Sequence, residues 1–271
     1  MELHINGHRA YAYTGGKAFN PALPAAVFLH GAQNDHSVWA LQTRYFAHHG
    51  FSVLAVDLPG HGRSGGVALA SVEAMADWLK ALLDAAGATK TILIGHSMGS
   101  LIALEAAART PSRVAGIALV GTAYPMKVSP MLLETSRDQE PVAIDMVNLW
   151  SHSSIAQKPS APGPGFYVQG GSRRLMQRIS QRNPNQVFFT DFSACNDYAN
   201  GEQAAAALSC PALFLLGRKD MMTPPKAAAK LSAKMPGAKT IVLDGSGHAL
   251  MAEQPDQVLD ALFGFATGAL K

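Results

Sequence analysis

The stretch Thr91-Ile92-Leu93-Ile94-Gly95-His96-Ser97-Met98-Gly99 decides the fold of this 271-residue chain and points to its chemistry. Its first four residues are apolar or β-branched and favour a buried strand, whereas residues 100–109 favour a helix. A G-x-S-x-G pattern between strand and helix predicts a sharp turn that strains the serine backbone. Gly95 and Gly99 are needed because a Cβ there would collide with the neighbouring strand and helix. We therefore expect Ser97 to be a nucleophile at a helix N-terminus, where amides favour negative charge.

The alternation of apolar strand and helix continues on both sides of this turn. Short apolar runs at 25–29, 51–56, 114–120, 212–216 and 240–243 predict strands buried on both faces, with helical stretches between most of them. A hairpin is predicted at the start of the chain, where Asn6-Gly7 separates two short strands. This rhythm favours the α/β class, with a parallel sheet covered by helices on both faces.

The alternation of strands and helices stops between Tyr124 and Gln203, in a segment rich in proline. Amphipathic stretches at 131–140, 141–150 and 172–181 predict helices there. We therefore expect a core domain made of residues 1–123 and 204–271, and a helical cap inserted as residues 124–203. Within this cap, Arg173, Arg174, Arg178 and Arg182 stand at helical spacing, and we interpret them as a solvated helix face rather than an anion site.

Composition narrows the class of protein. Apolar residues make up 48% of the chain and charged residues 15%, which suits a large core and argues against disorder. The net charge of +3 comes without a basic run, so we expect no nucleic-acid partner. Two cysteines give no disulfide framework, and no Cys or His spacing indicates a metal or another cofactor. No signal-peptide pattern and no apolar run of membrane-spanning length occurs, so we expect a cytoplasmic protein without a membrane span and leave a homodimer open.

A serine nucleophile needs a base, and the base needs an orienting acid. Asp220 follows the apolar run 212–216, and His248 follows the run 240–243. Because parallel strands end at one edge of a sheet, Ser97, Asp220 and His248 can meet there. Asp220 could instead only cap the next helix, and His248 could be a surface residue. The three residues occur together and in order, each at a strand end, which favours the catalytic interpretation.

An oxyanion formed during attack needs backbone donors. The N–H of Met98, directly after the nucleophile, is one candidate donor. The loop that begins His30-Gly31-Ala32 supplies the other, and we expect it to be the Ala32 N–H. We interpret His30 itself as a structural residue whose ring bonds local backbone.

These motifs together resemble the α/β-hydrolase superfamily. The resemblance rests on His30-Gly31, the segment Asp57 to Ser64, the turn Gly95 to Gly99, Gly217 to Asp220, and Gly247-His248. It implies an α/β-hydrolase fold with a mostly parallel eight-stranded sheet, helices on both faces and a helical cap. It also implies that the segment Asp57 to Ser64 is a structural loop beside the site.

Within the superfamily, the chain is similar to lid-bearing serine esterases and lipases. Haloalkane dehalogenases and epoxide hydrolases carry aspartate where Ser97 stands, which argues against those activities. Ser100 stands where carbon–carbon bond hydrolases often carry a further glycine, a mild argument against them. We therefore expect a serine hydrolase that acts on a small-to-medium apolar carboxylic ester, with a small-molecule ester as its partner.

Alternative functions remain open. A thioesterase, a lactonase or a perhydrolase would use the same three residues, and Arg173, Arg174 and Arg178 could serve a coenzyme-A-sized entrance. A non-catalytic ligand-binding relative is the remaining alternative. Large apolar side chains are the candidates for the substrate pocket: Trp39, Tyr124, Met126, Met146, Trp150, Phe166 and Leu250.

Overall fold

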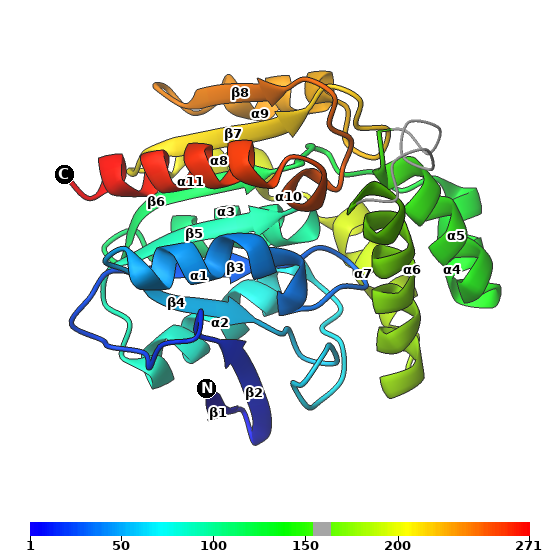
Figure 1. Ribbon diagram of the computed structural model, residues 1–271, viewed down its shortest axis with the longest axis horizontal. Coiled ribbons are helices and arrows are strands. Elements are labelled where there is room, and N and C mark those ends of the chain that lie inside the picture. The colour runs from blue at the N-terminus through cyan, green and yellow to red at the C-terminus, as the bar shows by residue number, and fades with distance from the viewer. Residues whose placement is uncertain (154–163) are drawn as a thin grey trace.

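An eight-stranded sheet forms the centre of the protein, in the order β1-β2-β4-β3-β5-β6-β7-β8. The computed structural model describes residues 1–153 and 164–271, and the side chains of 164–167 lie outside this description. β1 and β2 form the predicted hairpin, β2 pairs antiparallel with β4, and the remaining pairs are parallel. The expected mostly parallel eight-stranded sheet is therefore confirmed (Figure 1). The strands are β1 (Glu2–Ile5), β2 (His8–Tyr13), β3 (Ala25–Leu29), β4 (Ser52–Val56), β5 (Thr91–His96), β6 (Val114–Val120), β7 (Ala212–Gly217) and β8 (Lys239–Leu243).

The central strands are mostly apolar because both faces of the sheet are covered, and β3 is apolar at every position. Along β3, Val27 and Leu29 pack into one core while Ala26 and Phe28 pack into the other. Helices α1 and α11 cover one face, and α2 and α3 cover the opposite face (Figure 1). The helices of the two layers are α1 (Ala40–His48), α2 (Val72–Ala86), α3 (Met98–Arg109), α8 (Gly201–Ala206), α9 (Ala229–Ser232), α10 (Leu250–Glu253) and α11 (Pro255–Ala269), with short 3-10 helices η1 (His36–Trp39) and η2 (Pro225–Ala228).

A second group of helices lies between β6 and β7 in the sequence, and we call them the cap helices. They stand together beyond the carboxyl ends of the strands (Figure 1). Their shared apolar cluster includes Ile144, Met176 and Phe188. The sequence patterns anticipated three of them, whereas α7 was not predicted. The cap helices are α4 (Pro130–Asp138), α5 (Glu140–Ser151), α6 (Pro164–Arg182) and α7 (Val187–Asp197).

Within the described residues, no helix combines the length and the apolar character that crossing a membrane requires.

The turn from β5 into α3 depends on two missing side chains. A Cβ on Gly95 would lie 2.0 Å from the carbonyl oxygen of Gly99. A Cβ on Gly99 would lie 2.4 Å from the carbonyl oxygen of Leu29, the last residue of β3. Both contacts are to backbone, which cannot rotate away. Gly95 therefore lets the turn close, and Gly99 lets α3 begin directly against the end of β3.

We expect Gly99→Ala to lower the free energy of unfolding by about 3 kcal/mol, because the added methyl group forces β3 and α3 apart. Gly264→Ala is the matched control, since Gly264 lies in α11 with open space around its Cβ position. That control should be neutral or stabilising by about 0.5–1 kcal/mol. Urea unfolding followed by circular dichroism measures both, and equal stability of the two variants would contradict the close approach.

Candidate active site

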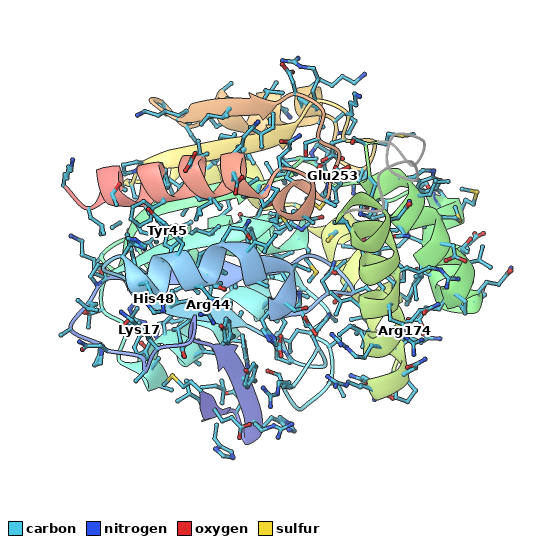
Figure 2. The ribbon with its side chains drawn as sticks, viewed as in Figure 1. Lys17, Arg44, Tyr45, His48, Arg174 and Glu253 are labelled. Carbon is cyan, nitrogen blue, oxygen red and sulfur yellow. The ribbon has the colours of Figure 1, made fainter. Side chains whose placement is uncertain are left out.

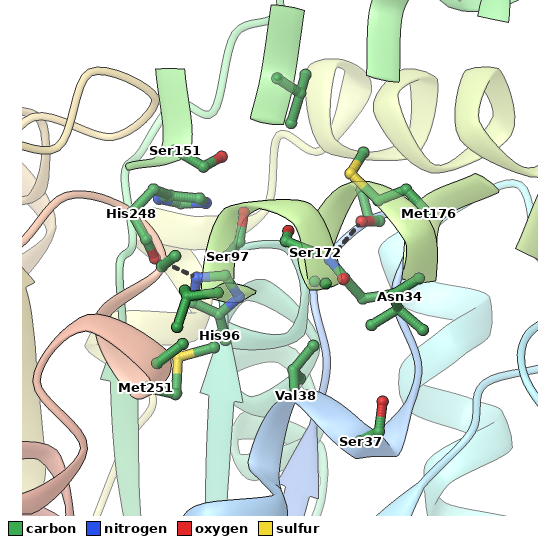
Figure 3. Close-up of a pocket in the computed structure, with 18 of the residues that line it drawn as sticks. Asn34, Ser37, Val38, His96, Ser97, Ser151, Ser172, Met176, His248 and Met251 are labelled. Atoms are coloured by element: carbon green, nitrogen blue, oxygen red, sulfur yellow. Dashed lines mark hydrogen bonds between the residues drawn. The ribbon is translucent and has the colours of Figure 1, made fainter. Parts of the chain in front are cut away.

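Ser97 sits at the turn between β5 and α3 in a strained backbone conformation, with φ 51° and ψ −119°. For a residue other than glycine this conformation is costly, so surrounding contacts must hold it. Its N–H donates to the carbonyl oxygen of Val120 at 2.9 Å, and its carbonyl oxygen accepts from the Ser100 N–H at 2.8 Å. The turn is thus fixed on both sides, and the Ser97 side chain faces a cavity (Figure 3).

The structure brings Asp220 and His248 into direct contact. Asp220 follows β7 and His248 follows β8, and the Asp220 Oδ2 lies 2.8 Å from the His248 Nδ1. The second carboxylate oxygen, Oδ1, accepts the N–H groups of Met222 at 2.8 Å and of Thr223 at 2.7 Å. The Thr223 hydroxyl donates to Oδ2 at 2.7 Å. The carboxylate is therefore clamped in one orientation toward the imidazole.

These contacts keep Asp220 ionised and fix the tautomer of His248. Burial opposes the charge, but His248 and the Thr223 donors outweigh it and lower the pKa of Asp220 to about 2. A charged carboxylate can only accept, so the His248 Nδ1 carries the hydrogen. The other ring nitrogen, Nε2, is then left with its lone pair and can act as a base.

The backbone of His248 is held by residues that the sequence patterns did not single out. The His96 Nε2 donates to the carbonyl oxygen of His248 at 2.9 Å (Figure 3). Burial lowers the pKa of His96 to about 3, so this ring is neutral. On either side, the Gly247 N–H donates to Glu253 at 2.6 Å and the Ala249 N–H donates to Ser151 at 2.9 Å. His96 occupies a variable place in the G-x-S-x-G pattern, so only the fold reveals its contact.

The loop after β3 carries Ala32, whose N–H is the second predicted oxyanion donor. The Gly31 carbonyl and the Ala32 N–H belong to one peptide plane, and the His30 Nδ1 donates to that carbonyl at 2.8 Å. The His30 Nε2 accepts the Leu58 N–H at 3.2 Å, so both ring nitrogens bond backbone, as expected. Among described residues, neither the Ala32 nor the Met98 N–H has a hydrogen-bond acceptor. Both donors are therefore free to bind a ligand oxygen.

A cavity of about 440 Å³ opens beside these groups. Ser97, His248 and Ala32 line one part of it, and residues of the cap helices α5, α6 and α7 line another. Figure 3 shows Ser151 of α5 and Ser172 and Met176 of α6 around the site. Its apolar lining is mainly aliphatic and includes Val38, Leu41, Val147, Leu175, Met176, Met222 and Met251.

The predicted pocket residues need correction, because none of those with described side chains lines this cavity. Large apolar side chains also build cores, and these do so. Trp39 and Leu250 are fully buried under the sheet, with the Trp39 ring 5.3 Å from that of Phe28. Tyr124 and Met126 lie in the core on the other face. Met146 and Trp150 pack against the apolar cluster of the cap. The Phe166 side chain lies outside the described residues.

Asp191 on α7 joins the cap to two core loops, the segment Asp57 to Ser64 and the loop that carries Ala32. The His61 Nε2 lies 2.8 Å from the Asp191 Oδ2 on α7, and the His61 Nδ1 lies 3.0 Å from the carbonyl oxygen of Pro59. The same Asp191 oxygen accepts the Gln33 N–H at 2.8 Å. Burial opposes protonation of His61, but Asp191 outweighs it and raises the pKa of this imidazole. Asp191 thereby holds Gln33, the neighbour of Ala32, and His61 at once.

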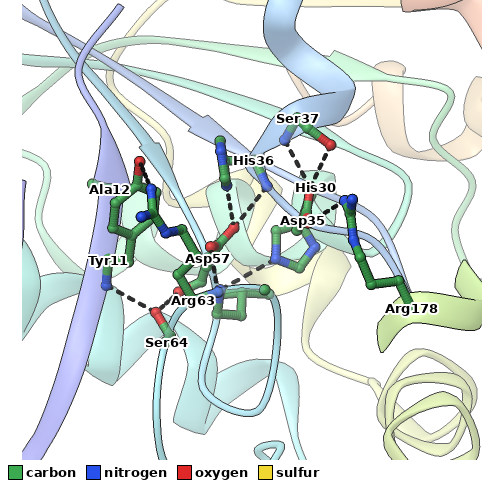
Figure 4. A network of polar contacts seen from close by, with 12 residues as sticks. Tyr11, Ala12, His30, Asp35, His36, Ser37, Asp57, Arg63, Ser64 and Arg178 are labelled. Carbon is green, nitrogen blue, oxygen red and sulfur yellow. Dashed lines mark hydrogen bonds and ion pairs between the residues drawn. The ribbon is translucent and has the colours of Figure 1, made fainter. Parts of the chain in front are cut away.

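The segment Asp57 to Ser64 is a structural loop, as the resemblance implied (Figure 4). The Asp57 Oδ1 accepts the His36 backbone N–H and ring Nδ1, each at 2.8 Å, and Oδ2 accepts the Arg63 N–H at 2.8 Å. Asp57 with Asp35 and His36 forms a cluster of the size that can hold a cation. N–H and O–H groups of the protein already donate hydrogen bonds to these carboxylates, so the cluster stabilises the loop.

Comparison with known proteins agrees with the fold described above. A family described as the alpha/beta hydrolase fold matches residues 24–255. A pimeloyl-[acyl-carrier protein] methyl ester esterase of Klebsiella pneumoniae is 28% identical over 251 residues, covering 89% of this chain and 93% of the relative. The enol-lactonase of Burkholderia xenovorans superposes with a TM-score of 0.85 at 23% identity, covering 98% of this chain and 100% of that one. An esterase from Thermogutta terrifontis gives 0.81 at 24% identity, covering 99% of each chain.

The His61–Asp191 pair makes stability depend on pH. Because folding raises the pKa of His61, its contribution is full below the ordinary value of about 6.5 and is lost as the pH rises through the folded value. We therefore expect His61→Gln to cost more free energy of unfolding at pH 6 than at pH 9. The difference should be about 1.4 kcal/mol for each unit of pKa shift.

Urea unfolding at the two pH values measures this effect. His4→Gln, at an exposed position in β1, is the control and should show no such difference. If His61→Gln cost the same at pH 6 and pH 9, His61 would not be charged in the folded protein.

Proposed function

The chain belongs to the α/β-hydrolase family, and from that premise we propose that it hydrolyses carboxylic esters through an acyl-enzyme on Ser97. The observation that carries the proposal is the geometry of one corner of the cavity. Ser97 and His248 both line it, and Asp220 holds the His248 Nδ1 at 2.8 Å. Esters are favoured as substrates because the curated relative described above is a methyl ester esterase.

In the proposed reaction, the His248 Nε2 takes the proton of Ser97 as the serine oxygen attacks the ester carbonyl carbon. Asp220 stabilises the imidazolium that forms and keeps its Nδ1–H in place. The tetrahedral intermediate collapses, the bond to the alcohol oxygen breaks, and His248 returns the proton to the departing alcohol. Water then attacks the acyl-enzyme by the same sequence and releases the acid.

Negative charge develops on the carbonyl oxygen during both attacks. The N–H groups of Ala32 and Met98 are the proposed donors to it, and the His30 bond to Gly31 fixes the direction of the first. Donors that are already oriented need no rearrangement as the charge appears, and each contributes on the order of a hundredfold or more in rate.

The cavity supports a small-to-medium substrate. Its volume of about 440 Å³ lies in the lower part of the range for small-molecule sites. Aliphatic side chains and methionines dominate its walls, which favours an aliphatic acyl chain next to the reacting carbonyl. The same groups would also open a thioester or a lactone, which need the same nucleophile, base and oxyanion donors.

We expect Ser97→Ala to lower kcat by on the order of 10⁴-fold or more for every substrate hydrolysed, because no other group can carry the acyl chain. Hydrolysis of p-nitrophenyl esters from acetate to decanoate measures this and gives the preferred acyl length. An unchanged melting curve would show that the variant is folded. Persistent turnover in the variant would refute the acyl-enzyme, and tight ligand binding without turnover in the native protein would favour a binding role.

We expect Asp220→Asn to lower kcat by on the order of 10³- to 10⁴-fold, with KM altered only a few-fold. The amide can donate to Nδ1 and so favours the wrong tautomer of His248. Asp244→Asn is the matched control, since Asp244 also follows a strand but is exposed and pairs with Arg218. That variant should keep native kcat. Comparable losses in both variants would remove Asp220 from the mechanism.

A further inference from the structure

Two arginines of the cap line the same cavity as Ser97. Arg174 and Arg178 stand one helical turn apart on α6, and both belong to the cavity wall. No acidic side chain lines the cavity among the described residues, and the sequence of residues 154–167 contains neither Asp nor Glu. The cavity therefore has a positive wall and no carboxylate of its own.

Arg178 is anchored and largely compensated. Its guanidinium lies 3.3 Å from the Oδ2 of Asp35, which is buried (Figure 4). The other oxygen of Asp35 accepts the Ser37 N–H at 2.9 Å, so the carboxylate itself is fixed. This pair leaves Arg178 in a defined position at the cavity with little net charge.

Arg174 is not compensated in this way. Its side-chain contact is with the neutral Gln177 Oε1 at 3.5 Å, and no described carboxylate lies within ion-pair distance of it. Arg174 projects from α6 on the side of the molecule formed by the cap helices (Figure 2). The neighbouring Arg173 differs, because it contacts Asp145 of α5 at 2.5 and 2.9 Å and does not line the cavity.

We propose that Arg174, with Arg178 beside it, binds a carboxylate group of the substrate, so that the preferred ester carries an ionised acid at the end remote from the ester bond. This inference rests on the proposed ester hydrolysis at Ser97. A guanidinium binds a carboxylate through two parallel hydrogen bonds, and the single uncompensated charge matches a monoanion better than a phosphate monoester. Aliphatic residues of the same helix, Leu175 and Met176, also line the cavity and suit the methylene chain between the two ends.

The four arginines of the basic cluster are all exposed, as predicted, but they do not share one environment. Arg173, Arg174 and Arg178 lie on one helix, as their spacing predicted, but the packing of α6 directs them to different neighbours. Arg173 faces α5, whereas Arg174 and Arg178 reach the cavity wall.

The test compares monomethyl esters of glutaric to suberic acid with methyl esters of monocarboxylic acids of the same length. The quantity measured is the ratio of kcat/KM for the acidic ester to kcat/KM for the neutral ester. In the native protein this ratio should reach about tenfold to a hundredfold at the best length, the effect of a hydrogen-bonded charge. In Arg174→Gln it should fall to near one, mainly through KM.

Arg173→Gln is the matched control, because it removes the same charge from the adjacent residue outside the cavity. Its ratio should stay native. Equal falls in both variants, or a native ratio near one with hydrolysis still dependent on Ser97, would overturn the carboxylate site alone. Absence of hydrolysis of both kinds of ester, or hydrolysis that survives Ser97→Ala, would overturn the proposed function and this inference with it.

Discussion

The close approach of α3 to the end of β3 is the constraint on which the site depends. It exists only because Gly99 has no side chain, since a Cβ there would lie 2.4 Å from the Leu29 carbonyl oxygen, while the absence of a Cβ on Gly95 lets the turn itself close. With the helix held there, Ser97 takes its strained conformation, and the Ala32 loop lies within reach of it. The proposed nucleophile and the two backbone N–H groups proposed as oxyanion donors thus depend on the same packing requirement. The strain is maintained by the sheet, because the N–H of Ser97 is bonded to β6.

Around this turn, burial and hydrogen-bond partners together determine whether His30, His96 and Asp220 are charged. His30 and His96 are buried against backbone partners, and burial lowers the pKa of both, so they serve as neutral hydrogen-bonding groups. Asp220 is buried as well, but its donors keep it charged. The cap takes part in the same way, since Asp191 on α7 bonds both His61 and the loop next to Ala32. Cap and core therefore share the polar contacts that hold the loop carrying Ala32.

The sequence predicted those features that follow from local residue chemistry and from the order of the strands. Apolar runs located the six strands β3 to β8, and the strand ends brought Asp220 to His248. The prediction that residues 240–243 are buried on both faces was wrong, because β8 is an edge strand and is exposed from Lys239 to Ile241. Side-chain partners across the fold were not predictable. Trp39 and Leu250 have the size and polarity of pocket residues, yet packing placed them in the core. His96 and Thr223 carry no local signal for their contacts with His248, because these contacts join segments distant in sequence. The helix α7 was missed although Phe188, Phe192 and Cys195 are buried at helical spacing, because the charged Asp191 lies on the same buried face and interrupts the apolar pattern.

The most direct test of the central claim, that Ser97 is the nucleophile, is covalent labelling with a fluorophosphonate followed by peptide mass spectrometry. Phosphonylation needs an activated serine together with the base and the oxyanion donors, so it reports on the assembled site rather than on one substrate. The expected result is one adduct per chain, on the peptide that contains Ser97, and no adduct in a His248→Ala variant that remains folded. An unlabelled native protein, or an adduct on a different serine, would contradict the role proposed for the turn between β5 and α3.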